Sequence, residues 1–237
     1  MSANTGGAQR EGLNMSAPMS RPRAIVFDMD GTLLDTETLA LRAWEEAAAA
    51  VGATFEHGLA HELIGKNFAD SATHVRAHFG QSDYPVDAVL EGWRPSFDAL
   101  VEREGVAVKP GANELLAWLA DAGIACAVAT STRRAQARTK LQQAGLLMHF
   151  VAVIGGDDVQ SGKPAPDIYL AAAAALRVPP AACLAIEDSE TGFRAAHAAG
   201  MPAILIPDLV MPGASLLALS PRVMQSLAEV HRLLSTC

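Results

Sequence analysis

Short apolar runs alternate with amphipathic stretches along most of this chain, and the alternation predicts its architecture. The first run, Ala24–Phe27, leads into the polar cluster Asp-Met-Asp-Gly-Thr, as expected for a buried parallel strand that opens into a turn. Further strands are predicted at 124–130, 151–156, 183–188 and 203–206, alternating with helices at 113–122, 133–144, 167–176 and 191–199. We therefore expect an α/β fold, a Rossmann-like doubly wound parallel sheet with helices on both faces.

The region between the first strand and residue 110 has a helical pattern instead. A helix is expected from Thr38 to about Val51, and helical stretches continue to about Glu104, interrupted by glycines and by Pro85. We predict an inserted all-helical cap domain over 36–109 and a core built from 23–35 and 110–237. The tail from Ser215 is expected to be helical.

Composition and charge narrow the class of protein. Half of the 237 residues are hydrophobic, and the net charge of −8 without a Lys/Arg run argues against a nucleic acid or an anionic membrane as partner. Residues 1–22 lack the apolar segment of a signal peptide, so a disordered leader is expected there. Cys126 and Cys183 lie in apolar runs, so we expect reduced thiols and a cytoplasmic location.

Polar side chains follow the predicted strands where the strands end. They are Asp28 and Asp30 after the first strand, Thr130 after the second, Lys163 in the loop after the third, and Glu187 and Asp188 at the end of the fourth. Because the carboxyl ends of parallel strands meet at one edge of a sheet, we expect these groups to form one site.

Asp28 and Asp30 are two residues apart, and on an ideal strand their side chains would share one face. When two carboxylates lie so near each other, they either bind a cation or acquire different pKa values. Gly31 would permit the tight turn that follows. An isolated Asp-x-Asp is often just a surface turn, but its position directly after an apolar strand favours a functional site.

Glu187 and Asp188 are adjacent, so a strand would point them to opposite faces and give them different roles. Clustered oxygen groups suit a hard cation such as Mg²⁺. We expect Asp28, Asp188 and the backbone carbonyl of Asp30 to be its ligands. Glu187 would lie near the metal or pair with Lys163. The alternative is that both acids cap the helix that begins near Ser189.

Lys163 lies in a loop that contains Pro164 and Pro166. A single surface lysine is usually solvated, but one held beside clustered carboxylates would offset the charge of a phosphate and a nucleophile. Thr130 precedes a predicted helix, so its hydroxyl and nearby N–H groups could bind phosphate oxygens. Its alternative role is that of a helix N-cap.

Taken together, DMDGT, VATST, GKPAPDIY and AIEDSETG resemble the motifs of the haloacid dehalogenase-like hydrolase superfamily, in the order and at the spacing of that family. The resemblance extends from Arg23 to Leu209. The segment DGTLLDTE and the helical stretch behind it are similar to the subgroup with a C1 helical cap, which includes β-phosphoglucomutase and sugar-phosphate or phosphoglycolate phosphatases.

The resemblance implies a role for each motif residue. Asp28 would be the nucleophile that forms an aspartyl-phosphate, and Asp30 the acid and base for the leaving alcohol and the water. Thr130, Ser131 and Lys163 would bind the phosphate. Mg²⁺ would lie among the acidic groups, for which the candidates are Asp28, Asp30, Glu187 and Asp188.

Differences from relatives narrow the reaction. Dehalogenases of the superfamily carry tyrosine at the position of Asp30 and phosphonoacetaldehyde hydrolases carry alanine. β-Phosphoglucomutases carry a histidine where this chain has Ala40, and an arginine for the second phosphate where it has Phe68. We therefore expect a phosphatase for a small, sugar-like phosphate monoester, with a phosphomutase as the alternative. A protein that only binds phosphate would need neither a nucleophile nor an acid.

The cap would select the substrate and close over the site, with hinges near 35–36 and 108–111. Phe68 and Trp93 are candidate walls of the substrate site. The polar candidates for substrate contact are Lys66, Asn67 and Arg76. The expected partner is one small phosphorylated metabolite, and the chain is expected to be a monomer.

Overall fold

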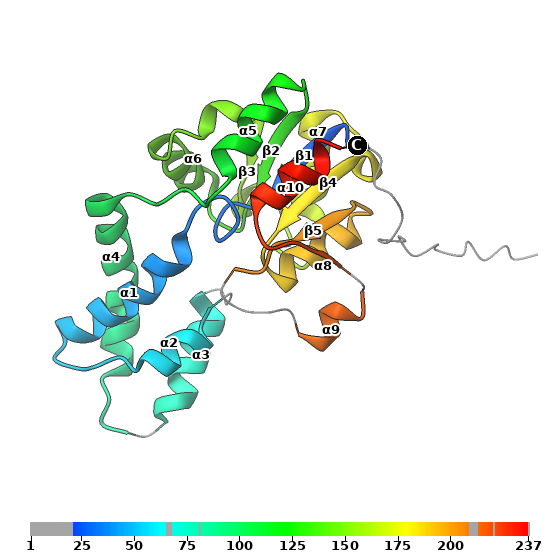
Figure 1. Cartoon of the computed structure of the whole chain (residues 1–237). Coiled ribbons are helices and arrows are strands. Elements are labelled where there is room, and N and C mark those ends of the chain that lie inside the picture. The colour runs from blue at the N-terminus through cyan, green and yellow to red at the C-terminus, as the bar shows by residue number, and fades with distance from the viewer. Residues whose placement is uncertain (1–20, 65–67, 81, 209–212, 220, 237) are drawn as a thin grey trace, which may run out of the picture.

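In the computed structural model, which describes residues 21–64, 68–80, 82–208, 213–219 and 221–236, a parallel sheet is covered by helices on both faces (Figure 1). Its strands run in the order β3-β2-β1-β4-β5-β6. Their bounds are β1 Ala24–Phe27, β2 Ala125–Ala129, β3 Ala152–Ile154, β4 Cys183–Glu187, β5 Ala203–Leu205 and β6 Arg222–Val223. The order reverses at β1, which places β1 between β2 and β4 in the middle of the sheet and at its topological switch point.

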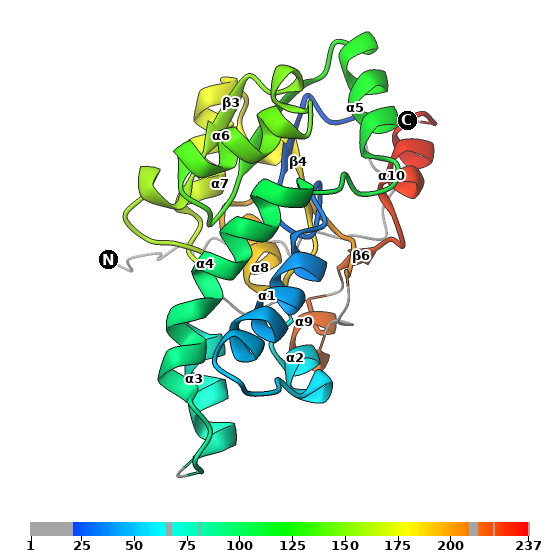
Figure 2. The same cartoon turned by 90° about the vertical axis from the view of Figure 1, so that its left-hand side faces the viewer.

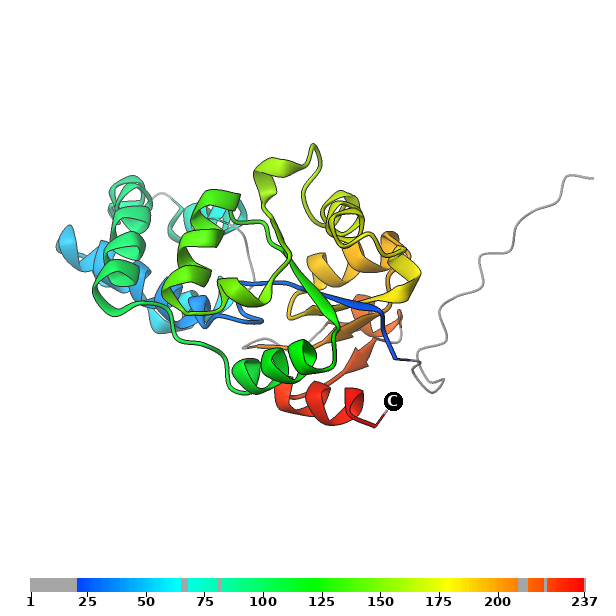
Figure 3. The ribbon, with the colours of Figure 1, turned by 90° about the horizontal axis from the view of Figure 1, so that it is seen from above.

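Alternate side chains of the central strands enter two separate cores. Ile25 and Phe27 pack with α5 (Ala112–Asp121), α6 (Arg134–Gln143) and α10 (Leu227–Leu234), whereas Ala24 and Val26 pack with α7 (Asp167–Leu176) and α8 (Glu190–Ala198). Figure 3 shows α5 and α10, green and red, on one side of the sheet and the yellow and orange helices on the other. The shorter helices are η1 Leu147–His149, η2 Gly156–Asp158, η3 Pro180–Ala182 and α9 Ala214–Leu217.

Helices α1 to α4 form a separate body beside the carboxyl ends of the strands. Their bounds are α1 Thr36–Ala50, α2 His57–Glu62, α3 Phe68–Phe79 and α4 Val86–Glu104. Figure 2 shows α1 and α4 side by side. Small buried residues on α1 let the two helices approach closely: a Cβ at Gly92 of α4 would lie 3.4 Å from the Cβ of Ala47. No strand occurs among the described residues of this body, which confirms the helical insertion.

Two chain crossings join the helical body to the sheet, and they pair with each other. Leu34 and Val108 form an antiparallel bridge. The N–H of Asp35 donates to the carbonyl of Ala107, and the N–H of Lys109 to that of Leu33, both at 2.9 Å. The two crossings, at the positions expected for a hinge, therefore form a short ribbon.

Most predicted elements are confirmed, with boundaries that differ by one or two residues. The helix expected at 38–51 begins at Thr36, since the carboxylate of Asp35 accepts from the N–H of Thr38 and caps it. The prediction of a wholly helical tail was wrong, because Arg222 and Val223 add a sixth strand beside β5. Two residues are too few to show the alternation that identifies a strand. The predicted leader over 1–22 falls almost entirely outside the described residues.

Among the described residues, none of the helices is both long enough and apolar enough to span a bilayer. Cys126 and Cys183 are buried and free, as expected. Burial raises the pKa of the Cys126 thiol to about 12.

Gly111 follows the second crossing and precedes α5 with φ +86°, and a Cβ there would lie 2.7 Å from the backbone nitrogen of Ala228. An alanine at position 111 would have to adopt a left-handed backbone conformation, and its Cβ would also clash with α10. We expect Gly111→Ala to lower the free energy of unfolding by about 2–4 kcal/mol in urea titrations. Gly123→Ala is the matched control, because Gly123 also has positive φ (+67°) but open space around its Cβ. Equal losses in the two variants would contradict the clash.

Candidate active site

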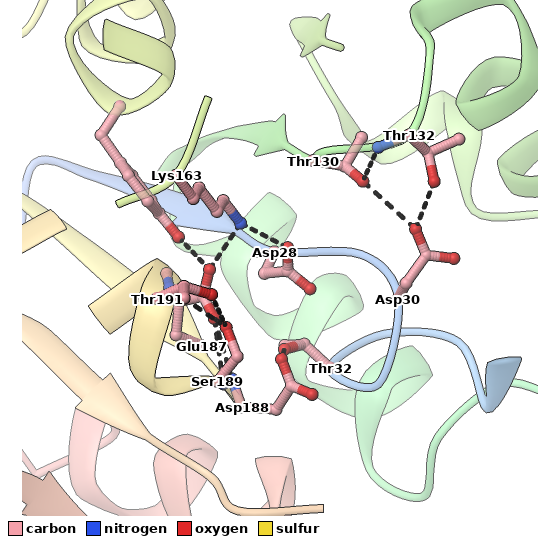
Figure 4. A network of polar contacts seen from close by, with 12 residues as sticks. Asp28, Asp30, Thr32, Thr130, Thr132, Lys163, Glu187, Asp188, Ser189 and Thr191 are labelled. Atoms are coloured by element: carbon pink, nitrogen blue, oxygen red, sulfur yellow. Dashed lines mark hydrogen bonds and ion pairs between the residues drawn. The ribbon is translucent and has the colours of Figure 1, made fainter. Parts of the chain in front are cut away.

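A cavity of about 310 Å³ lies between the carboxyl ends of the strands and the helices α1, α3 and α4. The structure brings most of the predicted core residues together, because the groups that line the cavity from the sheet side include Asp28, Asp30, Thr130, Ser131, Lys163 and Asp188. Figure 4 shows the polar network that they form with their neighbours.

Lys163 lies between two carboxylates at the end of the sheet. Its Nζ is 2.6 Å from Oδ1 of Asp28 and 2.5 Å from Oε1 of Glu187. The side chain of Lys163 is 5% exposed, that of Asp28 9% and that of Glu187 0%. The bulk solvent screens such a buried pair little, so Lys163 is the main neutralising charge for both acids.

Both carboxylate oxygens of Glu187 accept hydrogen bonds from neighbouring groups of the protein. Its Oε1 also accepts from the hydroxyl of Tyr169 at 2.6 Å, and its Oε2 from the hydroxyl of Ser189 at 3.0 Å. The backbone N–H groups of Asp188 and Ser189 donate to the same Oε2. The alternative that Glu187 pairs with Lys163 is confirmed, and both of its oxygens are already engaged.

Asp188 points away from Glu187, as expected for adjacent residues at the end of a strand. Its Oδ1 accepts from the hydroxyl of Thr32 at 3.3 Å. A side chain at Gly31 (φ +88°) would overlap the Asp188 carboxylate, so only glycine lets the first loop approach so closely. Neither acid caps the following helix, because Ser189 is the N-cap of α8.

The acidic cluster carries more negative charge than Lys163 can offset. Burial raises the pKa of Asp28, and Glu187 acts in the same direction against the lowering effect of Lys163. The pKa of Asp188 is also raised, by burial and then by the charges of Asp28 and Glu187. One oxygen each from Asp28, Glu187 and Asp188 lies within 4.8 Å of the others. Such a cluster is suited to a small divalent cation with oxygen ligands.

Asp30 lies in the same loop as Asp28 but has different partners. Nζ of Lys140 is 2.8 Å from its Oδ1, and the hydroxyls of Thr132 and Thr130 donate to its Oδ2 at 2.7 and 3.2 Å. The two carboxylates do not share one face of a strand, because β1 ends at Phe27 and both lie in the loop beyond it. Figure 4 shows Asp30 facing the two threonines.

Lys140 and Thr132 are site residues that the sequence did not reveal. Lys140 lies on α6, and its Nζ is also 5.3 Å from the centroid of the Phe97 ring on α4, so it connects the core with the helical body. Burial alone would raise the pKa of Asp30, but Lys140 and the two hydroxyls together lower it. The TST run after the second strand was the available signal for Thr132. A lysine on a polar helix carries no such signal in the sequence.

Thr130 is buried, and its hydroxyl accepts from the N–H of Thr132 at 3.1 Å. Its alternative role as an N-cap is wrong, because α6 begins at Arg134 with Arg133 in the cap position. Ser131 is exposed on the cavity wall. Thr130, Ser131 and Lys163 therefore line the same cavity.

The residues predicted for the cap have different outcomes. Phe68 and Trp93 line the cavity, as predicted for its walls. Arg76 is not brought to the site: its guanidinium binds Asp87 at 2.9 Å, its side chain is 58% exposed, and it does not line the cavity. Lys66 and Asn67 lie outside the described residues.

Comparison with known proteins gives consistent results. A family model described as haloacid dehalogenase-like hydrolase matches residues 22–200. Hexitol phosphatase A from Escherichia coli is 36% identical over 191 residues, which cover 78% of this chain and 83% of the relative.

Two solved structures extend the similarity to the fold. One is a hydrolase of the same family from Deinococcus radiodurans with bound phosphate and sodium, at 30% identity and a TM-score of 0.77, covering 91% of this chain and 96% of that one. The other is the protein CbbY from Rhodobacter sphaeroides in complex with phosphate, at 33% identity and a TM-score of 0.71, covering 88% and 96%. The chain therefore belongs to the haloacid dehalogenase-like hydrolase family.

Proposed function

We propose that the protein is a Mg²⁺-dependent phosphatase that hydrolyses a small phosphate monoester through an aspartyl-phosphate on Asp28. The observation that carries the proposal is the separation of two carboxylates in one loop. Asp28 is held by Lys163 beside the acidic cluster, and Asp30 is held by Lys140 and two threonine hydroxyls. A nucleophile and a proton carrier need such different surroundings.

In the first step, a carboxylate oxygen of Asp28 attacks phosphorus in line while the bond to the leaving alcohol breaks. Lys163 and the hydroxyl of Ser131 bind the transferring phosphoryl oxygens, joined by the hydroxyl of Thr130 once Asp30 has released it, so catalysis is mostly positioning and charge neutralisation. Asp30 donates a proton to the leaving oxygen. Asp30 is paired with Lys140 in the structure. To act as the acid it must break this contact and take up a proton from solvent, which it then donates to the leaving oxygen.

In the second step, water hydrolyses the aspartyl-phosphate and Asp30 removes the proton from that water. The contacts that lower the pKa of Asp30 favour the anionic form that this step requires. The same carboxyl group therefore serves as acid and then as base.

Asp28 and Asp188, with the backbone carbonyl of Asp30, would hold the magnesium ion. Both oxygens of Glu187 are engaged with Lys163, Tyr169 and Ser189, so we assign Glu187 to holding Lys163 beside the metal site. When bound, the ion neutralises the charge of the phosphate and of the carboxylates around it. The crowding of Asp28 and Asp188 supports this assignment.

Several observations support hydrolysis of a sugar-like ester over mutase activity. Ala40 and Phe68 stand where β-phosphoglucomutases carry a histidine and an arginine, and both line the cavity. A second phosphate would therefore meet an alanine and an aromatic ring. Relatives named as hexitol phosphatase and phosphorylated carbohydrates phosphatase support a phosphorylated sugar or sugar alcohol as the substrate class, without distinguishing a ring from an open chain. The phosphomutase remains the alternative, and a cytoplasmic monomer completes the proposal.

Asp28→Asn should lower kcat by about 10⁴-fold or more, because the amide is a poor nucleophile and cannot form the acyl phosphate. Phosphate release from a panel of sugar phosphates, phosphoglycolate and p-nitrophenyl phosphate would measure it. EDTA should abolish the activity of the native chain and added Mg²⁺ should restore it. Asp121→Asn on the exposed side of α5 is the control. Substantial activity in Asp28→Asn would contradict the nucleophile, and isomerisation without release would favour the mutase.

Asp30→Asn should affect esters according to their leaving group. For alkyl phosphates, formation of the intermediate should slow by about 10²–10⁴-fold, the usual contribution of a positioned acid. For p-nitrophenyl phosphate, whose leaving group needs no proton, a rapid burst of p-nitrophenol should remain and be followed by slow turnover. Rapid-quench and stopped-flow measurements give both rates. The same loss of burst rate for every leaving group would exclude Asp30 as the acid.

Lys140→Met should shift the acid limb of the kcat–pH profile to higher pH. The pKa of Asp30 is lowered by Lys140, so without this lysine Asp30 becomes protonated at a higher pH and stops acting as the base. A kcat–pH profile with p-nitrophenyl phosphate, for which breakdown of the intermediate limits turnover, would show the shift. Arg138→Met removes an exposed charge from the same helix and should leave the profile unchanged. An unshifted limb in Lys140→Met would contradict the assignment.

A further inference from the structure

The cavity has two unlike halves. The sheet side presents carboxylates, hydroxyls and Lys163, whereas the helical side presents mostly apolar groups. Among the described residues of that second half, the aromatic ones are Trp44, Phe68, Trp93 and Phe97. The part of the substrate that is not phosphate must occupy the space against this second half.

The four rings form one cluster centred on Trp93. The ring centroids of Phe68 and Trp93 are 5.0 Å apart, those of Trp44 and Trp93 5.5 Å, and those of Trp93 and Phe97 5.4 Å. The indole N–H of Trp93 donates to the carbonyl of Ala40 at 3.2 Å, which fixes the orientation of that ring. The cluster therefore forms an aromatic wall in which the central ring is held by a hydrogen bond.

Two of these rings offer surface to a ligand. Trp44 and Phe97 are 3% and 5% exposed and serve as backing, but Phe68 is 43% exposed and Trp93 is half-buried. Polar groups occur in the same half of the cavity: Glu37, Asp70, Ser71 and Arg94 all line it. Apolar ring surface and polar groups are thus both available to the leaving alcohol.

This arrangement discriminates between shapes of leaving group. A sugar ring has C–H groups on its faces and hydroxyls at its edge. It can therefore pack on an aromatic face while its hydroxyls contact the polar groups of the cavity. An open-chain polyol would press hydroxyls against apolar carbon, which leaves them without partners, and would lose more rotational freedom on binding.

Building on the proposed function, we propose that the helical cap recognises the leaving alcohol through the flat face of a ring packed on Phe68 and Trp93. The site thereby selects ring-form phosphate esters over open-chain ones. A sugar ring and an aromatic ring share this chemistry, and two substrate pairs distinguish them.

Glucose 6-phosphate and sorbitol 6-phosphate form the first pair, because they carry the same primary phosphate and differ in ring closure. Benzyl phosphate and n-hexyl phosphate form the second. Dissociation constants would be measured calorimetrically on Asp28→Asn with Mg²⁺, and kcat/KM on the native chain. We expect the ring member of at least one pair to be favoured by about tenfold in both measurements, the upper range for one ring-on-ring contact.

Phe68→Leu tests the surface itself, because leucine keeps apolar volume but removes the flat face. The ring preference should fall to about twofold or less in this variant. Phe79→Leu, at the other end of α3 and outside the cavity lining, should keep the preference of the native chain.

The binding measurements separate this inference from the proposed function. A ring preference on Asp28→Asn that Phe68→Leu removes supports the inference even if the native chain hydrolyses no ester, in which case the proposed function alone fails. A preference confined to the sugar pair or to the aryl pair supports it and assigns the kind of ring. Open-chain esters that bind as tightly as their ring partners, or equal losses for both members in Phe68→Leu, overturn it.

Discussion

The end of the sheet depends on one buried ammonium group between two buried carboxylates. Asp28 and Glu187 are almost fully removed from water, and without Lys163 their charges would face each other in a medium that screens them poorly. Removing one partner of such a group leaves a buried charge without compensation. Lys163 therefore allows the carboxylate of Asp28 to be buried at the carboxyl end of a parallel sheet.

The other contacts of the network keep Lys163 in place. Tyr169 reaches Glu187 from α7, and Ser189 reaches it from the start of α8, so two helices on the same face of the sheet hold the acid that holds the lysine. Gly31 and Gly192 leave room for this arrangement, since a Cβ at either position would overlap a carboxylate of Asp188 or Glu187. The carboxyl ends of the strands supply one half of the cavity, and the helical cap supplies the other half.

Much of this site could be predicted because its residues directly follow apolar runs. Asp28, Thr130 and Asp188 were recognisable from their position at strand ends, where a parallel sheet must bring them together. Lys140 was not, because a lysine in a polar helix looks the same whether it points to solvent or to Asp30. The aromatic wall was predicted only in part: Phe68 and Trp93 were expected to border a substrate, whereas Trp44 and Phe97 were not. Which face of a helix meets a cavity is decided by tertiary packing.

Leu34 takes part in two pairings at once. It bridges to Val108 in the ribbon between the sheet and the helical body, and it bridges to Asp30 within the first loop, where its carbonyl accepts from the N–H of Gly31 at 2.8 Å. A rotation of the helical body about the ribbon must therefore act on the backbone that carries Asp30. Lys140 makes a second connection of the same kind, since it contacts Asp30 on one side and the Phe97 ring on the other. Asp30, which we propose as the proton carrier, is thus mechanically coupled to the cap, whereas Asp28 is anchored to the sheet through its N–H, which donates to the carbonyl of Ile186.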